Sequence, residues 1–167
     1  NQALMELGAT ICLPNGAPLC EKWPAAALCR AFQEGRTGEL PVKGAKRPRR
    51  VEERTVYLLF HGDSVALRRR PDRGLLAGLW EYPNEPADGT DWLSRWGLSA
   101  PLERAGTGKH IFTHIEWHMT ALAGEADNPA LPEGWVWANR TALRDTYAVP
   151  NAFRSFEQAV LDRLGHF

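Results

Sequence analysis

The sequence lacks the features of secreted and membrane-embedded proteins. It has no secretory signal segment and no apolar run near the ~18 residues that a membrane span needs. Three cysteines, an odd and small number, argue against a disulfide framework. An excess of charge is also absent, with 20 Lys and Arg against 20 Asp and Glu, so net charge predicts no polyanionic partner. We therefore expect a monomer of a reducing compartment, by default the cytoplasm, with no membrane partner.

Composition divides the 167 residues into three parts, enough for one ordinary domain and an appendage. Residues 1–35 contain a helical apolar pattern, a loop with all three cysteines and a short Ala-rich helix, too little for a core. Residues 36–54 have few apolar side chains, which is typical of a linker. The linker carries a basic cluster: Lys43, Lys46, Arg47, Arg49 and Arg50. This cluster suits either a solvated hinge or a tether that contacts phosphate. The chain begins inside a helical pattern, so we expect a fragment of a longer protein.

Residues 55–167 carry the signals of an α+β domain, in which a mixed sheet is flanked by helices. The β-branched and aromatic runs at 55–60 and 65–70, separated by HGDS, predict a hairpin. Further strands are predicted at 109–123 and 135–138. A helix over DWLSRW, capped by Asp88 or Thr90, should end at Gly97, and a last helix at 152–164 should end at Gly165.

The segment HIFTHIEWH repeats histidine every fourth residue, at His110, His114 and His118. On a helix these side chains would lie on one face and suit a metal. The apolar residues, however, alternate with period two and are β-branched or aromatic, which favours a strand. Successive histidines on one strand face are about 13 Å apart, too far for a single metal ion. We therefore expect no metal site in this segment.

Two segments resemble the A/G-specific adenine DNA glycosylases, the MutY family of base excision repair. They are RRRPDRGLLAGLWEYPN (68–84) and HIFTH (110–114), supported by the ending at 137–156. Residues 1–12 resemble the end of the family's helix-hairpin-helix catalytic domain, so the resemblance extends over nearly the whole chain. It implies a Nudix (MutT)-like domain at 55–167 that recognises 8-oxoguanine opposite adenine in double-stranded DNA, in a bacterial-type, nucleoid-associated protein. The catalytic domain of the family removes the mispaired adenine.

The resemblance assigns the recognition of 8-oxoguanine to Phe112, Thr113 and His114. The lesion differs from guanine by O8 and by a hydrogen on N7, and the Thr113 hydroxyl can both accept and donate. Stacking of Phe112 on a base contributes about 1–3 kcal/mol. Contacts with DNA phosphate are expected from basic residues of the linker and strand: Lys46, Arg47, Arg49, Arg50, Lys109 and His110. Without the resemblance, the same segment describes an ordinary strand with Phe112 in the core.

Catalytic residues are the main omission. The family's catalytic Glu and Asp resemble nothing in this chain, so we expect the chain itself not to cleave. A Nudix hydrolase needs an Arg-Glu-x-x-Glu-Glu box to hold Mg²⁺, whereas the helix predicted after Gly78 carries only Asp91. No Nudix magnesium site is therefore expected. The alternatives are a divergent Nudix-type hydrolase, a non-catalytic binder of oxidised nucleotides, or a domain that only stabilises its parent.

The cysteines only partly match the family's 4Fe-4S loop, Cys-x6-Cys-x2-Cys-x5-Cys. In this sequence seven residues separate Cys12 from Cys20, and five residues separate Trp23 from Cys29. Trp23 stands where the third cysteine should be, and an indole is not an iron ligand. We expect an incomplete set, with an intact cluster and buried structural cysteines as the alternatives.

Overall fold

The computed structural model describes residues 1–13, 15–42, 44 and 48–165. Its contacts divide the chain into two compact units, Asn1–Arg47 and Pro48–Phe167. This division falls inside the predicted linker. Among the described residues, no helix has the length and apolar character needed to cross a membrane.

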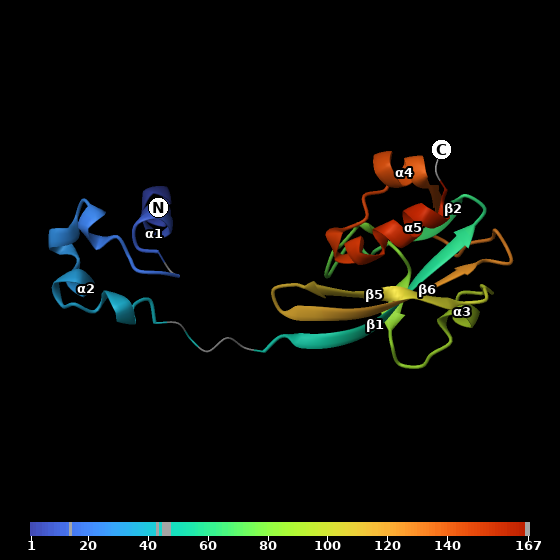
Figure 1. Cartoon of the computed structure of the whole chain (residues 1–167), viewed down its shortest axis with the longest axis horizontal. Coiled ribbons are helices and arrows are strands. Elements are labelled where there is room, and N and C mark those ends of the chain that lie inside the picture. The colour runs from blue at the N-terminus through green and yellow to red at the C-terminus, as the bar shows by residue number, and fades with distance from the viewer. Residues whose placement is uncertain (14, 43, 45–47, 166–167) are drawn as a thin grey trace. The chain divides into compact units, whose positions relative to one another are not determined.

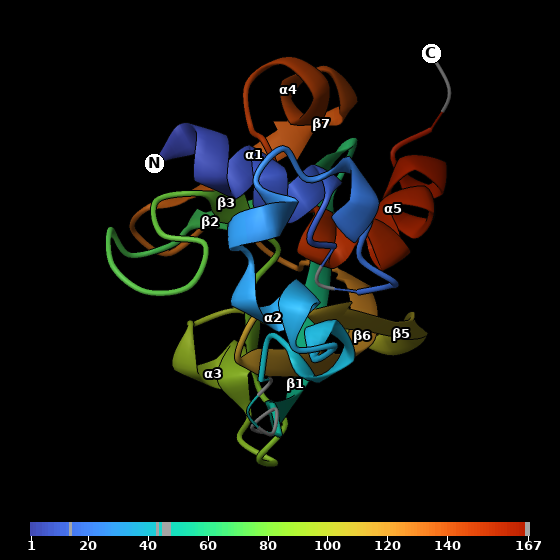
Figure 2. The same ribbon diagram turned by 90° about the vertical axis from the view of Figure 1, so that its left-hand side faces the viewer.

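The first unit is a series of short helices joined by loops (Figure 2). It contains α1 (Gln2–Thr10), η1 (Cys20–Lys22), η2 (Ala26–Leu28), α2 (Arg30–Gln33) and η3 (Thr37–Glu39). None of these helices has a fully buried residue. The unit thus has the predicted helix and cysteine loop, and its described residues contribute nothing to the two buried clusters of the chain.

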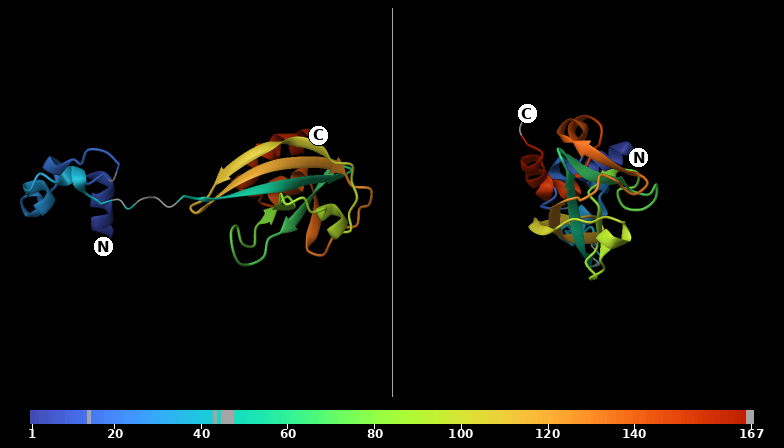
Figure 3. Two further views of the ribbon diagram at one scale, coloured as in Figure 1. Left: turned by 90° about the horizontal axis from the view of Figure 1, so that it is seen from below. Right: turned by 90° about the vertical axis from the view of Figure 1, so that its right-hand side faces the viewer.

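The second unit is a seven-stranded mixed sheet (Figure 1). Its strands are β1 (Arg50–His61), β2 (Ser64–Arg69), β3 (Trp80–Glu81), β4 (Asn84–Pro86), β5 (Glu103–Ile111), β6 (Ile115–Glu125) and β7 (Trp135–Asn139). The order is β3-β2-β1-β6-β5, with β4 on β1 and β7 on β2. Only β1 and β6 are parallel. Figure 3 shows β1, β6 and β5 running side by side as long strands.

Helices cover both faces of this sheet and create two apolar cores. The helices are α3 (Trp92–Arg95), α4 (Arg140–Asp145), η4 (Asn151–Phe156) and α5 (Glu157–Arg163). On one face, Val56 and Leu58 of β1 pack with Phe153, Phe156 and Val160 of η4 and α5. On the other, Tyr57 and Leu59 pack with Leu93 and a group of tryptophans around α3. The alternation along β1 therefore feeds both cores, as the predicted α+β fold requires.

Several predicted elements are confirmed. The β1–β2 hairpin turns at Gly62, which has a positive φ of 59°, and His61 pairs with Ser64 across the turn. Helix α3 ends before Gly97, and the strand predicted at 135–138 is β7. The cap of α3 was predicted wrongly, because Asp91, and neither Asp88 nor Thr90, accepts the Ser94 N–H. The last predicted helix begins as the 3-10 turn η4 and becomes α-helical only at Glu157.

The single strand predicted at 109–123 is wrong. The chain reverses after Ile111, and β5 and β6 form an antiparallel hairpin in which His110 faces Trp117 and Lys109 faces His118. His110 and His118 therefore point to opposite faces, not to the same one. The turn contains no Gly, Pro or Asn, so no turn-forming residue predicted it. Strand β1 also begins earlier than predicted, because residues 50–54 of the expected linker pair with β6.

Candidate nucleic-acid interface

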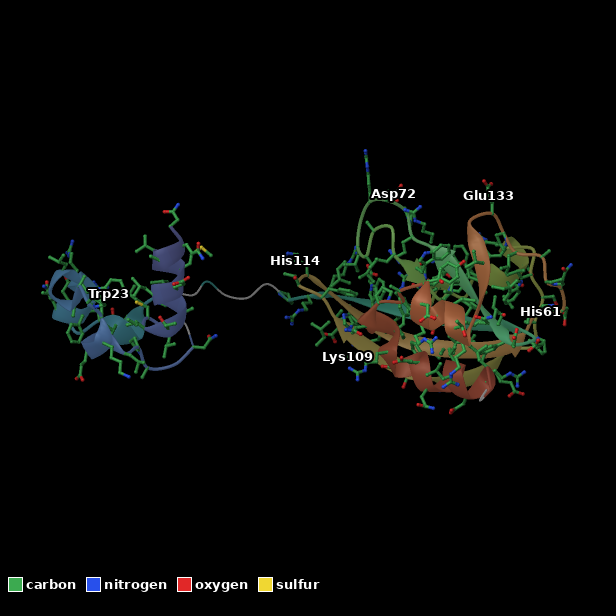
Figure 4. The ribbon with its side chains drawn as sticks, turned by 90° about the horizontal axis from the view of Figure 1, so that it is seen from above. Trp23, His61, Asp72, Lys109, His114 and Glu133 are labelled. Atoms are coloured by element: carbon green, nitrogen blue, oxygen red, sulfur yellow. The ribbon has the colours of Figure 1, made fainter. Side chains whose placement is uncertain are left out.

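The turn of the β5–β6 hairpin, Phe112–His114, is called the FTH turn below. It lies at one end of the sheet, and His61 of the β1–β2 turn lies at the opposite end (Figure 4). The Phe112 N–H donates to the Ile115 carbonyl at 2.8 Å, which closes the turn. Thr113 and His114 are exposed, and the Thr113 hydroxyl has no hydrogen bond within the described part of the chain. The turn thus presents a hydroxyl free to donate and to accept.

Phe112 has a different role from its two neighbours. Its ring is half-buried between His110, with ring centroids 4.6 Å apart, and Trp117, with centroids 4.9 Å apart. Both contacts are edge-to-face, an arrangement that aromatic pairs favour. Trp117 in turn contacts Phe153 in the core at 6.1 Å. Phe112 therefore anchors the FTH turn to the core, which fixes the direction in which Thr113 projects.

The loop Pro71–Leu79, called the GLLAG loop below, is held by a buried network of charges. Glu81 is only 1% exposed, and it accepts from Arg68 at 2.9 Å and from Arg70 at 2.6 Å. Arg70 also donates to the Leu75 carbonyl within the loop at 2.7 Å. Leu76 adopts a left-handed φ of 56°, a conformation that needs support from surrounding contacts. The network thus fixes an otherwise exposed loop to the end of β2.

Trp117 connects the GLLAG loop to the FTH turn. Two guanidinium groups lie over its ring, Arg54 at 4.7 Å and Arg70 at 5.8 Å from the ring centroid. Its indole N–H donates to Glu52 at 2.9 Å. Phe112, Leu75 and Leu76 all pack against the same core. The two segments that carry the sequence resemblance, separated by the 25 residues 85–109, therefore meet around one buried tryptophan.

The opposite face of the hairpin carries a separate polar network. His118 lies 2.7 Å from Glu116 through Nε2 and 3.0 Å from Glu53 through Nδ1, and Lys109 lies 2.6 Å from the same Glu116 oxygen. The hydrogen bond to Glu116 raises the pKa of His118 above its ordinary value. The hydrogen bond from the Lys109 ammonium group lowers the pKa of Glu116 below its ordinary value. This face has two carboxylates around one lysine and one histidine, so it offers no excess of positive charge to phosphate.

Those of the predicted phosphate-contacting residues that the structure describes do not lie on one face. His110 shares a face with Trp117, while Lys109 points to the other face and is paired with Glu116. The Arg50 side chain is paired with Glu52. Arg49 is exposed and donates to the Phe112 carbonyl at 3.1 Å. Lys46 and Arg47 lie outside the described residues, as does Lys43.

The cysteine loop of the first unit does not fit a four-thiolate iron-sulfur cluster. Cys12 is exposed, Cys20 and Cys29 are half-buried, and all three thiols are free. Trp23 replaces the third thiolate, and its indole Nε1 is buried without a partner among the described residues. An indole N–H is a donor only and cannot ligate iron. The loop therefore contains only three of the four soft ligands that such a cluster takes, and the described residues do not group these three as metal ligands.

Among the described residues, the carboxylates next to α3 are engaged with other groups and are not arranged as a Nudix magnesium site. On α3, Asp91 uses its carboxylate to cap Ser94. Glu81 and Glu85, which precede α3, are both paired with Arg68. Within the part of the chain that the structure describes, no three His, Cys, Asp or Glu side chains are grouped as metal ligands.

Sequence reasoning missed the residues that hold the interface together: Trp117, Arg54, Arg68, Arg70 and Glu81. One signal was available. Arg68, near the end of β2, and Arg70, just beyond it, are two residues apart and so share a face, and Arg68 is in register with Glu81 of β3. The position of Trp117 opposite His110 could not be predicted from the sequence, because it depends on the turn between β5 and β6.

Comparison with known proteins supports the resemblance drawn from the sequence. Residues 55–159 match the model of the NUDIX domain family. Mouse adenine DNA glycosylase is 31% identical in an alignment that covers 94% of this chain and 42% of that protein. The chain thus spans less than half the length of this relative. The predicted likeness to adenine DNA glycosylases is confirmed.

Two solved structures are similar to the second unit. The MutT protein of Methanosarcina mazei Go1 has a TM-score of 0.54 at 16% identity, covering 71% of this chain and 97% of that one. The C-terminal domain of mouse MUTYH, solved in complex with human PCNA, is 27% identical with a TM-score of 0.49, covering 65% and 88%. The MutT likeness confirms the predicted Nudix-like fold.

Proposed function

This chain belongs to the NUDIX domain family through residues 55–159, and from this premise we propose that it reads 8-oxoguanine for an adenine DNA glycosylase. The partner is double-stranded DNA that carries 8-oxoguanine opposite adenine. The removal of that adenine is assigned to a catalytic domain that supplies the general acid and the sugar-stabilising carboxylate. The role of this chain is recognition.

One observation carries this proposal. The FTH turn exposes Thr113 while its neighbour Phe112 is fixed in the core, and the GLLAG loop is packed against the same core. A hydroxyl held in this way can accept the N7–H that 8-oxoguanine has and guanine lacks. A preformed contact discriminates better than a mobile one, because less ordering cost accompanies binding.

The charge distribution supports a reader that binds DNA weakly by itself. The net charge is zero, and the carboxylates near Lys109 compensate its charge. Few phosphate contacts mean a low nonspecific affinity with a shallow dependence on salt, because the slope scales with the number of contacts. Preference for the lesion should therefore be measurable at low salt.

The residue-level test compares Thr113→Ala with Thr120→Ala in the full-length glycosylase. Thr120 lies within β6, away from the turn, so its substitution serves as a matched control. Thr113→Ala should reduce the preference for adenine opposite 8-oxoguanine over adenine opposite guanine, and Thr120→Ala should not. An unchanged preference in the Thr113 variant would contradict the assignment.

A second measurement separates recognition from hydrolysis. Incubation of the chain with 8-oxo-dGTP and Mg²⁺ should release no pyrophosphate, because the carboxylates that precede α3 are paired with arginine. Release of pyrophosphate would replace the reader with a divergent Nudix hydrolase.

A further inference from the structure

The start of β1 holds the FTH turn from outside the hairpin. Arg49 Nε donates to the Phe112 carbonyl at 3.1 Å. The next residue, Arg50, donates its backbone N–H to the His114 carbonyl, also at 3.1 Å. Two of the three carbonyls of the turn are therefore bonded to residues more than 60 positions earlier in the chain.

We propose that Arg49 is a positioning residue for the FTH turn, acting through the Phe112 carbonyl. This inference rests on the proposed function and goes beyond it, since the basic cluster was expected to contact phosphate. A trans peptide is planar, so its carbonyl and the following N–H point in opposite directions. When Arg49 holds the Phe112 carbonyl, it also fixes the direction of the Thr113 N–H.

The Thr113 N–H is free for a ligand. It has no hydrogen bond to another described group, unlike the Phe112 N–H, which is bonded to Ile115. Thr113 thus presents two groups on one exposed residue, a hydroxyl and a backbone donor. The donor suits O8 of the lesion, which guanine lacks, and the hydroxyl suits N7–H. A rotation of the peptide between Phe112 and Thr113 would separate the pair.

Arginine is suited to this role in a way that lysine is not. The planar guanidinium presents its donors in a fixed geometry, whereas an ammonium group is a point charge on a flexible stem. Arg49→Lys therefore keeps the charge available to phosphate and loses the directed bond to the carbonyl. Arg104→Lys is the matched control, because Arg104 is exposed on β5 and lies outside the FTH turn and the GLLAG loop.

The first readout is binding of this chain at several salt concentrations to duplexes with 8-oxoguanine or guanine opposite adenine. Arg49→Lys should lower the ratio of the two affinities about fivefold to tenfold, the effect of one charge-assisted hydrogen bond. The salt dependence should stay unchanged. Arg104→Lys should keep the ratio. If Arg49→Lys keeps the ratio and only Arg49→Ala weakens both duplexes equally, Arg49 is a phosphate contact and the proposal is wrong.

The second readout needs no DNA. NMR relaxation of the free chain should show a lower backbone order parameter for Thr113 in Arg49→Lys than in the unsubstituted chain or Arg104→Lys. Equal order parameters would overturn the positioning role. If the unsubstituted chain shows no lesion preference, the proposed function fails, and the order parameters still decide whether Arg49 positions the turn.

Discussion

Glu81→Gln is the substitution with the largest expected effect on the fold. Glu81 is 1% exposed, and its two oxygens accept separately from Arg68 and Arg70. A glutamine side chain would direct an NH₂ group at one guanidinium and leave two half-buried cations without their shared carboxylate. Removal of one partner from a buried ion pair costs about 3–5 kcal/mol. Arg68 keeps its contact with Glu85 at 2.5 Å, so we expect the lower end, about 3 kcal/mol.

Thermal unfolding followed by tryptophan fluorescence measures this loss. For a unit of this size, about 3 kcal/mol corresponds to a fall in Tm of about 10 °C. Asp145→Asn is the control, because it breaks an exposed pair with Arg144 and should leave Tm nearly unchanged. Since Arg70 also holds the Leu75 carbonyl, backbone amides of the GLLAG loop should exchange faster in Glu81→Gln. A fall in Tm below about 3 °C would refute the reasoning, since the network would then contribute no more than a surface pair.

Three further outcomes are expected. The pKa of His118 is raised in the folded protein. Its network therefore stabilises the protein fully below the unfolded pKa of 6.5, and this stabilisation is lost as the pH rises through the pKa of the folded state. The substitution His118→Gln should flatten the dependence of Tm on pH above about 6.5. Gly108→Ala would place a Cβ 2.9 Å from the Ser155 Cβ and 3.0 Å from Phe156, which should cost about 1–3 kcal/mol in urea unfolding, whereas Thr107→Ala on the exposed side of β5 should cost little. Iron and sulfide analysis of the purified chain should find no stoichiometric 4Fe-4S cluster, and a full cluster would show that a ligand other than Trp23 completes the set.

The elements with strong local signals were predictable from sequence. The β1–β2 hairpin follows from two β-branched runs around Gly62, and α3 ends where Gly97 permits a positive φ of 69°. The family was also predictable, because two short segments carry its pattern.

What the sequence did not reveal depends on contacts between distant residues. The FTH turn has no turn-forming residue and is held by Arg49 and Arg50 from the start of β1. Because the turn was not predicted, one strand with side chains alternating between its two faces was predicted through it. That prediction placed His110 and His118 on the same face. Phe112 was expected to stack on a base, yet its ring is committed to His110 and Trp117, which favours an anchoring role. Its stacking on DNA stays a prediction.

Binding of this chain at low salt to two duplexes that differ only in 8-oxoguanine or guanine opposite adenine tests the central claim most directly. The account predicts tighter binding to the lesion and loss of that difference in Thr113→Ala. Equal binding of the unsubstituted chain to both duplexes would contradict it, and would mean that the exposed Thr113 does not read the base.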